Sequence, residues 1–237
     1  MVKRSLLVGT AALAAGATLV TTAAASGSHD SPRSGSSLRT YQIIVHNNTE
    51  GQPLSPPVLV THSKRVDLWS VGTIASHPVA AIAEDADNAP LISVAAHIRG
   101  IREAQTAVTA GASGPAPIGP MASQTYRLTT DSSHTRLTLL SMLVNSNDAF
   151  TGLDATRLPD HIGQTRTFTK MAYDAGSEVN NEKAAFIPGP IGGHRFVRDP
   201  EGNVIRMHPG IVGGADLSPT LHSVNGTVAT ITITRVT

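Results

Sequence analysis

The sequence has no cysteine among its 237 residues, so it can form no disulfide and cannot carry a cysteine-linked lipid anchor. Only 3% of the residues are aromatic, and a hydrophobic core must therefore be built mainly from Val, Ile, Leu and Ala. The formal net charge is only +1, which gives no electrostatic reason to expect a nucleic acid or an anionic membrane as partner.

The chain also lacks the short motifs of two common classes of hydrolase. It has no H-E-x-x-H, and its ten histidines are scattered, so we predict no zinc site. It has no G-x-S-x-G, and Ser141 lies inside a strand pattern, where a nucleophile would be hard to expose. We therefore expect a non-catalytic protein.

The first residues have the pattern of a secretory signal peptide. Lys3 and Arg4 are basic, residues 6–20 are apolar, and three alanines at 23–25 suit a cleavage site. The apolar run is shorter than the roughly 20 residues of a membrane span, and no later run is long enough, so we expect no membrane insertion. We predict a signal peptide over 1–25 and a secreted protein.

The rest of the chain has two compositional parts. Residues 26–39 are rich in Ser and Gly without hydrophobic periodicity, which predicts a disordered lead-in. Residues 40–237 are long enough for one domain. The predicted cleavage leaves 237 − 25 = 212 residues with 18 − 2 = 16 basic and 17 acidic side chains.

Most of the domain alternates with the two-residue period of a β-strand. Such alternation, separated by turn-forming residues, predicts a mainly β fold with an antiparallel sandwich of about seven strands. We expect the strands at residues 40–47, 57–62, 125–130, 135–144, 166–173, 203–208 and 226–236.

One or two short helices are expected in the 76–110 region. Ser76 could cap a helix over 79–85, with Pro78 near its first turn. Apolar residues from Leu91 to Ile101 mark one face of a second helix.

Three aspartates are the candidate site. Asp148, Asp154 and Asp174 each lie beside small or turn-forming residues at the end of an apolar run, and Glu178 follows in a Gly/Ser/Asn-rich stretch. Carboxylates on loops are ligands that Ca²⁺ prefers. If two strands bring these loops to one end of a sandwich, the mutual repulsion of the carboxylates would need a cation to offset it. The alternative is ordinary turn chemistry.

A second acidic stretch, residues 83–88, contains Glu84, Asp85 and Asp87. It is interpreted as a polar helix end, with a second metal site as the alternative. Trp69 could face a ligand, although a buried Trp is the more common arrangement.

Residues 141–154, SMLVNSNDAFTGLD, and 172–182, AYDAGSEVNNE, together resemble the spondin domain. The opening 41–62, YQIIVHNNTEGQPLSPPVLVTH, and the IPGP segment at 187–190 are also similar to its bacterial branch. This module occurs in extracellular-matrix spondins and mindin and as free-standing bacterial secreted proteins.

The resemblance implies a β-sandwich related to C2 domains that holds a structural Ca²⁺. It assigns the ligand carboxylates to Asp148, Asp154 and Asp174, with Glu178 in the same acidic loop. Matrix spondins carry disulfides and thrombospondin-type repeats and have an aromatic residue where this chain has Ala149. These differences weaken any transfer of the animal proteins' adhesion to integrins or matrix.

The sequence hypothesis is thus a secreted calcium-binding domain with an extracellular binding or adhesion role toward an unidentified protein or glycan. Two alternatives stay open. One is a Ca²⁺-dependent carbohydrate-binding module, and the other is a Ca²⁺-stabilised secreted hydrolase with a deep cleft that holds a His–carboxylate pair.

Overall fold

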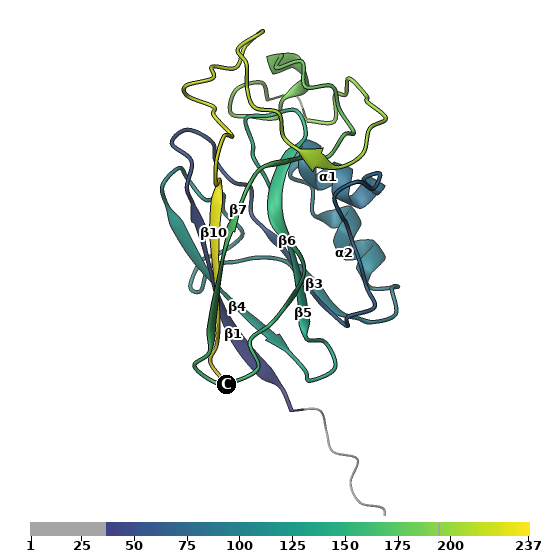
Figure 1. Ribbon diagram of the computed structural model, residues 1–237, viewed down its shortest axis with the longest axis vertical. Helices are drawn as coiled ribbons and strands as arrows, with labels where there is room; N and C mark the ends of the chain where they lie inside the picture. The colour runs from purple at the N-terminus through teal and green to yellow at the C-terminus, as the bar shows by residue number, and fades with distance from the viewer. Residues whose placement is uncertain (1–36, 194) are drawn as a thin grey trace, which may run out of the picture. The chain divides into compact units, whose positions relative to one another are not determined.

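A computed structural model describes residues 37–193 and 195–237 (Figure 1). The predicted signal peptide, 1–25, and all of the predicted lead-in except residues 37–39 lie outside the described residues. Arg39, the last residue of that lead-in, already belongs to the first strand.

The described chain forms two antiparallel sheets, which confirms the predicted fold class. The first sheet has four strands in the order β4 (Ser123–Thr130), β1 (Arg39–Asn47), β10 (Ala229–Arg235) and β7 (Thr165–Lys170). The second has six in the order β3 (Ile101–Thr106), β2 (Val58–His62), β5 (Arg136–Met142), β6 (Ala149–Arg157), β8 (Tyr173–Asp174) and β9 (Arg206–Met207).

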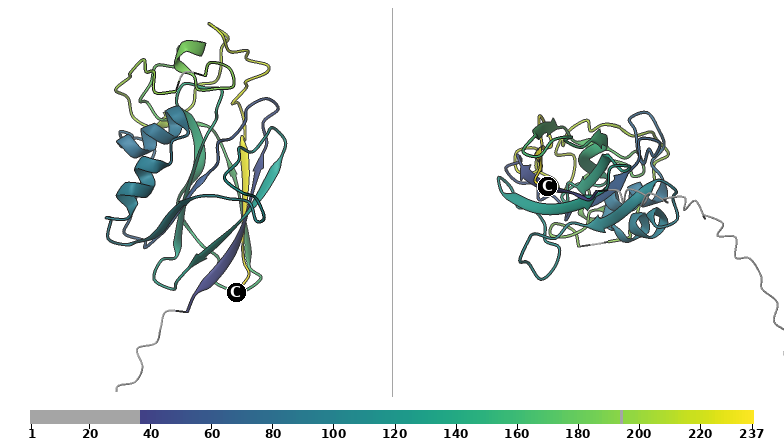
Figure 2. Two further views of the ribbon diagram at one scale, coloured as in Figure 1. Left: turned by 180° about the vertical axis from the view of Figure 1, so that it is seen from behind. Right: turned by 90° about the horizontal axis from the view of Figure 1, so that it is seen from below.

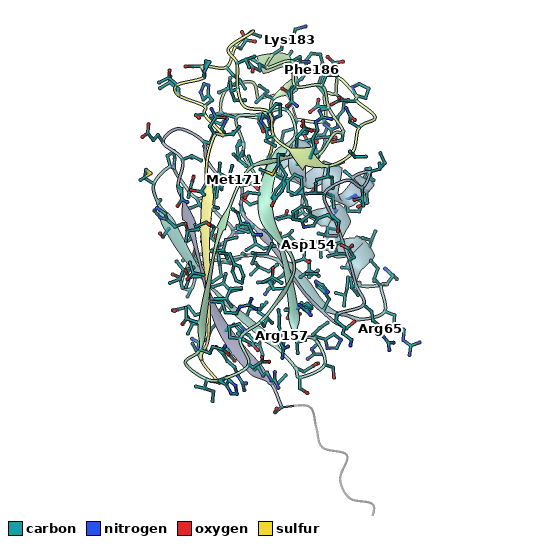
Figure 3. All side chains as sticks on the ribbon, viewed as in Figure 1. Arg65, Asp154, Arg157, Met171, Lys183 and Phe186 are labelled. Atoms are coloured by element: carbon teal, nitrogen blue, oxygen red, sulfur yellow. The ribbon has the colours of Figure 1, made fainter. Side chains whose placement is uncertain are left out.

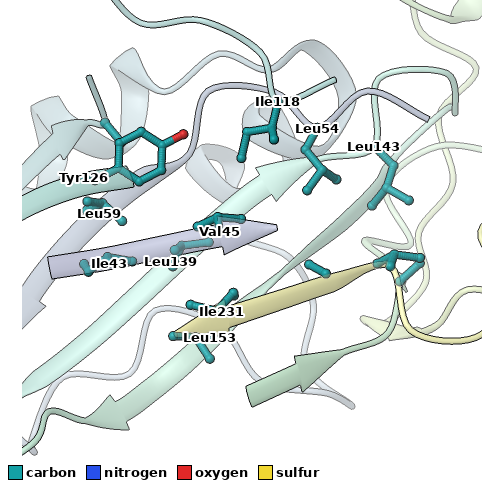
Figure 4. Packing of buried hydrophobic residues seen from close by; sticks show 14 of the residues in the cluster. Ile43, Val45, Leu54, Leu59, Ile118, Tyr126, Leu139, Leu143, Leu153 and Ile231 are labelled. Atoms are coloured by element: carbon teal, nitrogen blue, oxygen red, sulfur yellow. The ribbon is translucent and has the colours of Figure 1, made fainter. Parts of the chain in front are cut away.

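The main core lies between the two sheets (Figure 4). Strand β1 alternates, with Ile43 and Val45 buried while Gln42 is exposed, and Ile231 of β10 is buried beside them. The six-stranded sheet contributes Leu139 and Leu153 from the other side. The period-two pattern of these strands therefore comes from one face in the core and one face in water.

Two helices, α1 (His77–Asp85) and α2 (Ala89–Ala95), cover the other face of the six-stranded sheet (Figure 2). All five residues of β2 are buried, because Leu59 faces the sandwich core while Val58 and Val60 pack in a second cluster with Ile82 of α1. A short 3₁₀ helix, η1 (Ala184–Phe186), lies in the long connection after β8.

The second predicted helix is wrong beyond residue 95. Helix α2 ends at Ala95, Gly100 adopts a φ of 99°, and Ile101 begins strand β3, which pairs with β2. A positive φ is easily adopted only by glycine and ends the helical path. The apolar residue at 101 therefore continues a buried face, but as part of a strand.

The predicted loop around Asp154 is also wrong, because residues 149–157 form strand β6. A glycine such as Gly152 is typical of a turn, but an added Cβ there would lie 1.8 Å from the carbonyl oxygen of Leu139. The glycine thus permits close approach of β5 to β6. Residues 149–153 do not alternate in exposure because both faces of the strand are buried.

Two other predicted strands are shorter than expected. The segment 166–173 is divided, since β7 belongs to the four-stranded sheet and β8 to the six-stranded sheet. Only Arg206–Met207 of the segment 203–208 form a strand, β9, next to an isolated bridge between Ile74 and Val204.

Candidate functional site

The long connections after β8 gather at one end of the sandwich, together with the β5–β6 connection (Figure 1). We call this region, residues 143–148, 175–193 and 195–227, the loop end. Asp148 immediately precedes β6, Asp174 ends β8, and Glu178 follows in the next loop. Ala149 pairs with Asp174 in the β6–β8 ladder, which brings the first two carboxylates to neighbouring positions.

Asp148 is fully buried, and only one of its two carboxylate oxygens has a hydrogen-bond partner. Its Oδ2 accepts hydrogen bonds from the amides of Ser177 and Glu178 at 2.9 and 3.0 Å, while its Oδ1 has no partner. Burial, reinforced by the charge of Asp174, raises the pKa of Asp148 to about 7, despite those two hydrogen bonds. A buried carboxylate oxygen without a partner is costly unless the group is protonated or meets a cation.

Glu178 repeats this arrangement. It is also fully buried, its Oε1 accepts the amide of Asp199 at 3.1 Å, and its Oε2 has no partner. Burial raises the pKa of Glu178 to about 8, and the nearby charges of Glu84 and Asp148 act in the same direction. The structure therefore brings two buried carboxylates together, each with one unpaired oxygen.

Asp174 is buried as well, but both of its oxygens are engaged. Oδ1 accepts the amide of Gly176 at 2.7 Å, and Oδ2 accepts hydrogen bonds from Asn180 at 2.7 Å and Arg206 at 2.9 Å. Gly176 has a φ of 68°, and an added Cβ would lie 2.7 Å from the backbone of Asn203. A glycine is therefore needed where the chain turns between Asp174 and Glu178.

Asp154 does not join these three residues. It lies six positions from Asp148, within strand β6, a separation of roughly 20 Å at the usual rise per residue of a strand. Figure 3 shows it part-way along the sheet, away from the loops that carry Lys183 and Phe186. Its neighbours are Ser70, whose Oγ is 3.5 Å away, and Asp67, whose charge adds to burial in raising the pKa of Asp154.

The sequence interpretation missed the contribution of helix α1. Glu84 and Asp85 are its last two residues and are buried, and both pair with Arg198. The charge of Glu84 acts on both Asp148 and Glu178, so the stretch interpreted as a separate polar helix end belongs to the same site. Asp87 does not, because it accepts the amide of Ala89 at 3.0 Å, at the start of α2.

We call Glu84, Asp85, Asp148, Asp174 and Glu178 the acidic cluster. Five carboxylates and the two guanidinium groups of Arg198 and Arg206 give a formal charge of −5 + 2 = −3 when all are ionised. Among residues 37–193 and 195–237, no three Asp, Glu or His side chains are arranged as a set that could hold a metal ion. Three of the carboxylates, Glu84, Asp85 and Asp174, pair with arginines instead.

Other residues singled out from the sequence have structural surroundings. Trp69 is buried, and its ring lies edge-on to Phe150 and to Tyr173, with centroids 5.0 Å apart in both pairs. Ser141 is buried in β5 and donates a hydrogen bond to the carbonyl of Ser55 at 2.7 Å.

The structure contains a His–carboxylate pair, in which Nδ1 of His134 lies 2.8 Å from Oδ1 of Asp131. Asp131 also accepts the amides of Ser133 and His134 at 2.8 and 3.2 Å, so its carboxylate organises the turn between β4 and β5. These bonds account for the pair as a structural feature of that turn.

Comparison with known proteins identifies the family. No curated protein matches the chain. No helix within the described ranges is long and apolar enough to cross a membrane. The family model described as Spondin_N matches residues 49–182, more than half of the chain, and this match includes Glu84, Asp148, Asp174 and Glu178. The chain belongs to the spondin domain family.

Proposed function

We propose that this protein is a secreted, non-catalytic spondin domain that binds one Ca²⁺ in its acidic cluster and uses the ordered loop end to bind an extracellular partner. The observation that supports the proposal is the pair of unpaired oxygens, Asp148 Oδ1 and Glu178 Oε2, both on fully buried side chains. The family match adds support, because the spondin domain is typically extracellular.

The donor chemistry favours calcium over softer metals. The cluster offers carboxylate oxygens and has no cysteine, and Ca²⁺ takes six to eight oxygen ligands from carboxylates, carbonyls and water. Asp148 and Glu178 would supply ligands directly. Asp174, held by Gly176 and Asn180, would add negative charge beside Asp148.

The role proposed for the ion is structural. With Asp148 and Glu178 ionised, repulsion between them opposes the hydrogen bonds through which they hold the amides of Ser177 and Asp199. A divalent cation would offset that repulsion and keep both loops in place. The ion would then determine whether the loop end presents a fixed surface.

Calcium binding can be measured directly by calorimetric titration of chelator-treated protein. We expect one site for the wild type, and a dissociation constant raised at least about tenfold in Asp148→Asn. Asp154→Asn is the matched control, because Asp154 also has a buried oxygen without a partner but lies outside the acidic cluster. Absence of a calcium signal from the folded wild type, or equal weakening in the two variants, would reject the proposal.

A glycan is the second candidate partner, and a polar cavity of about 410 Å³ favours it. Its wall includes Asn48, Glu50, Thr220, Asn225 and Thr227, whose amide, carboxylate and hydroxyl groups could bind sugar hydroxyls. A glycan array probed with and without Ca²⁺ tests this candidate. Binding lost in Asn225→Ala would support it, and an array without binding in both conditions would reject it.

A further inference from the structure

A short segment, residues 195–200, is held against the end of helix α1 by an arginine. The Nε of Arg198 pairs with Glu84 and its terminal nitrogen pairs with Asp85. The amide of Phe196 donates a second bond to Asp85, at 2.8 Å. We call residues 195–200 the strap.

The position of Glu84 in α1 is electrostatically unfavourable. Glu84 and Asp85 occupy the C-terminal end of the helix, where the helix dipole repels negative charge, and the last turn contains no basic residue. Burial raises the pKa of Glu84 even though Ser177 and Arg198 act in the opposite direction. The only guanidinium that pairs with Glu84 among the described residues comes from the strap.

Glu84 is also close enough to the two carboxylates with unpaired oxygens for its charge to raise the pKa of both. Ser177 links the two parts of the cluster, because its amide and hydroxyl both contact Asp148 and it also acts to lower the pKa of Glu84. The charge of Arg198 in turn acts to lower the pKa of Glu178. A cation between Asp148 and Glu178 would therefore compete with Arg198 for the carboxylate of Glu84.

We propose that Glu84 is a further ligand of the cation site and that Arg198 occupies this ligand until a divalent cation displaces it. This inference rests on the proposed calcium function. Asp85 keeps Arg198 nearby after the exchange, so the strap loses one of its charged contacts and stays attached through the other. Calcium binding is thereby linked to the position of Phe196 and Val197, whose side chains are 63% and 44% exposed.

The test is a double-mutant cycle on the calcium dissociation constant. Glu84→Gln removes the proposed ligand and should weaken binding about tenfold, whereas Arg198→Gln removes the competitor and should tighten it several-fold. In the Glu84→Gln background, the gain from Arg198→Gln should disappear, because there is no longer a carboxylate to compete for. A long-range charge effect of Arg198 would instead add to that of Glu84.

Two further measurements guard against misfolding. Near-ultraviolet circular dichroism of the buried Trp69 reports whether each variant keeps its fold. Arg198→Lys keeps the charge but loses the forked geometry, so it should bind calcium with an affinity between those of wild type and Arg198→Gln.

The outcomes separate the two proposals. A wild type that binds no calcium overturns both. A wild type that binds calcium, with Glu84→Gln folded and unchanged in affinity, overturns only the role of Glu84. Additive effects in the cycle overturn the displacement of Arg198.

Discussion

In the sandwich, the fully buried side chains include Ile43, Leu139 and Ile231, whereas at the loop end they include Asp148 and Glu178. In the sandwich, strands pair with strands, and side-chain acceptors for backbone amides are used at a few places such as Met142 and Ala155. The loop end has few strands, and its buried amides need other partners.

Carboxylates supply many of those partners. Glu182, also buried, accepts the amides of Val212, Gly213 and Gly214 at 2.6, 2.7 and 2.9 Å, and Asp148 accepts those of two residues in another loop. Irregular backbone can therefore be ordered by buried carboxylates. The consequence is a concentration of negative charge that the apolar sandwich does not have.

The largest expected effect separates the two regions. Leu139→Ala should lower the free energy of unfolding by about 2–5 kcal/mol, because it leaves a cavity in the sandwich core. Urea unfolding in EDTA and in excess calcium should show the same loss, since Leu139 is remote from the acidic cluster. A loss that depends strongly on calcium would show that the two regions are not energetically separate.

A smaller effect is expected from pH at the loop end. The folded-state pKa values of Asp148 and Glu178 are raised to about 7 and about 8, so each stabilises the calcium-free fold fully below its unfolded value of about 4. That contribution is lost as pH rises through the folded values. The midpoint of thermal unfolding in EDTA should therefore fall between pH 6.5 and 8.5.

Burial lowers the pKa values of His208 and His222, so these two residues make the folded state more stable as pH rises toward about 6.5. Measuring above pH 6.5 avoids most of this opposing effect. Asp148→Asn should reduce the pH dependence, while Asp154→Asn should change it less. Calcium binds the ionised carboxylates, so the stabilisation that it adds should grow over the same range. A midpoint in EDTA that rises with pH would contradict the assignment.

The fold class was predictable from the sequence, but the limits of some elements were not. Strands with one face in water, such as β1 and β10, show the two-residue alternation that predicts them. Strand β6 has both faces buried over its first five residues and contains Gly152, so its sequence resembles a turn. The apolar pattern from Leu91 to Ile101 likewise predicts one helix but spans a helix and the start of a strand, with Gly100 at a positive φ between them.

The grouping of the carboxylates was predictable in part. Neighbouring strand ends bring Asp148 and Asp174 together as expected, and Glu178 is near enough to interact with Asp148. Asp154 lies elsewhere, because the predicted loop around it is part of strand β6. Glu84 lies 64 residues before Asp148, and Arg198 lies 50 residues after it. The residues around Asp148 therefore give no indication that either side chain is close to it. Only the packing of α1 and the strap against the loops brings them into the cluster.

The most direct measurement of the central claim is thermal unfolding of the wild type and of Asp148→Asn, each in EDTA and in excess calcium. At 100 times its dissociation constant, calcium should stabilise the wild type by about 2.7 kcal/mol, and it should leave Asp148→Asn nearly unchanged. Equal midpoints for the wild type in the two buffers would contradict the claim that a cation is needed to offset the buried charge of the loop end.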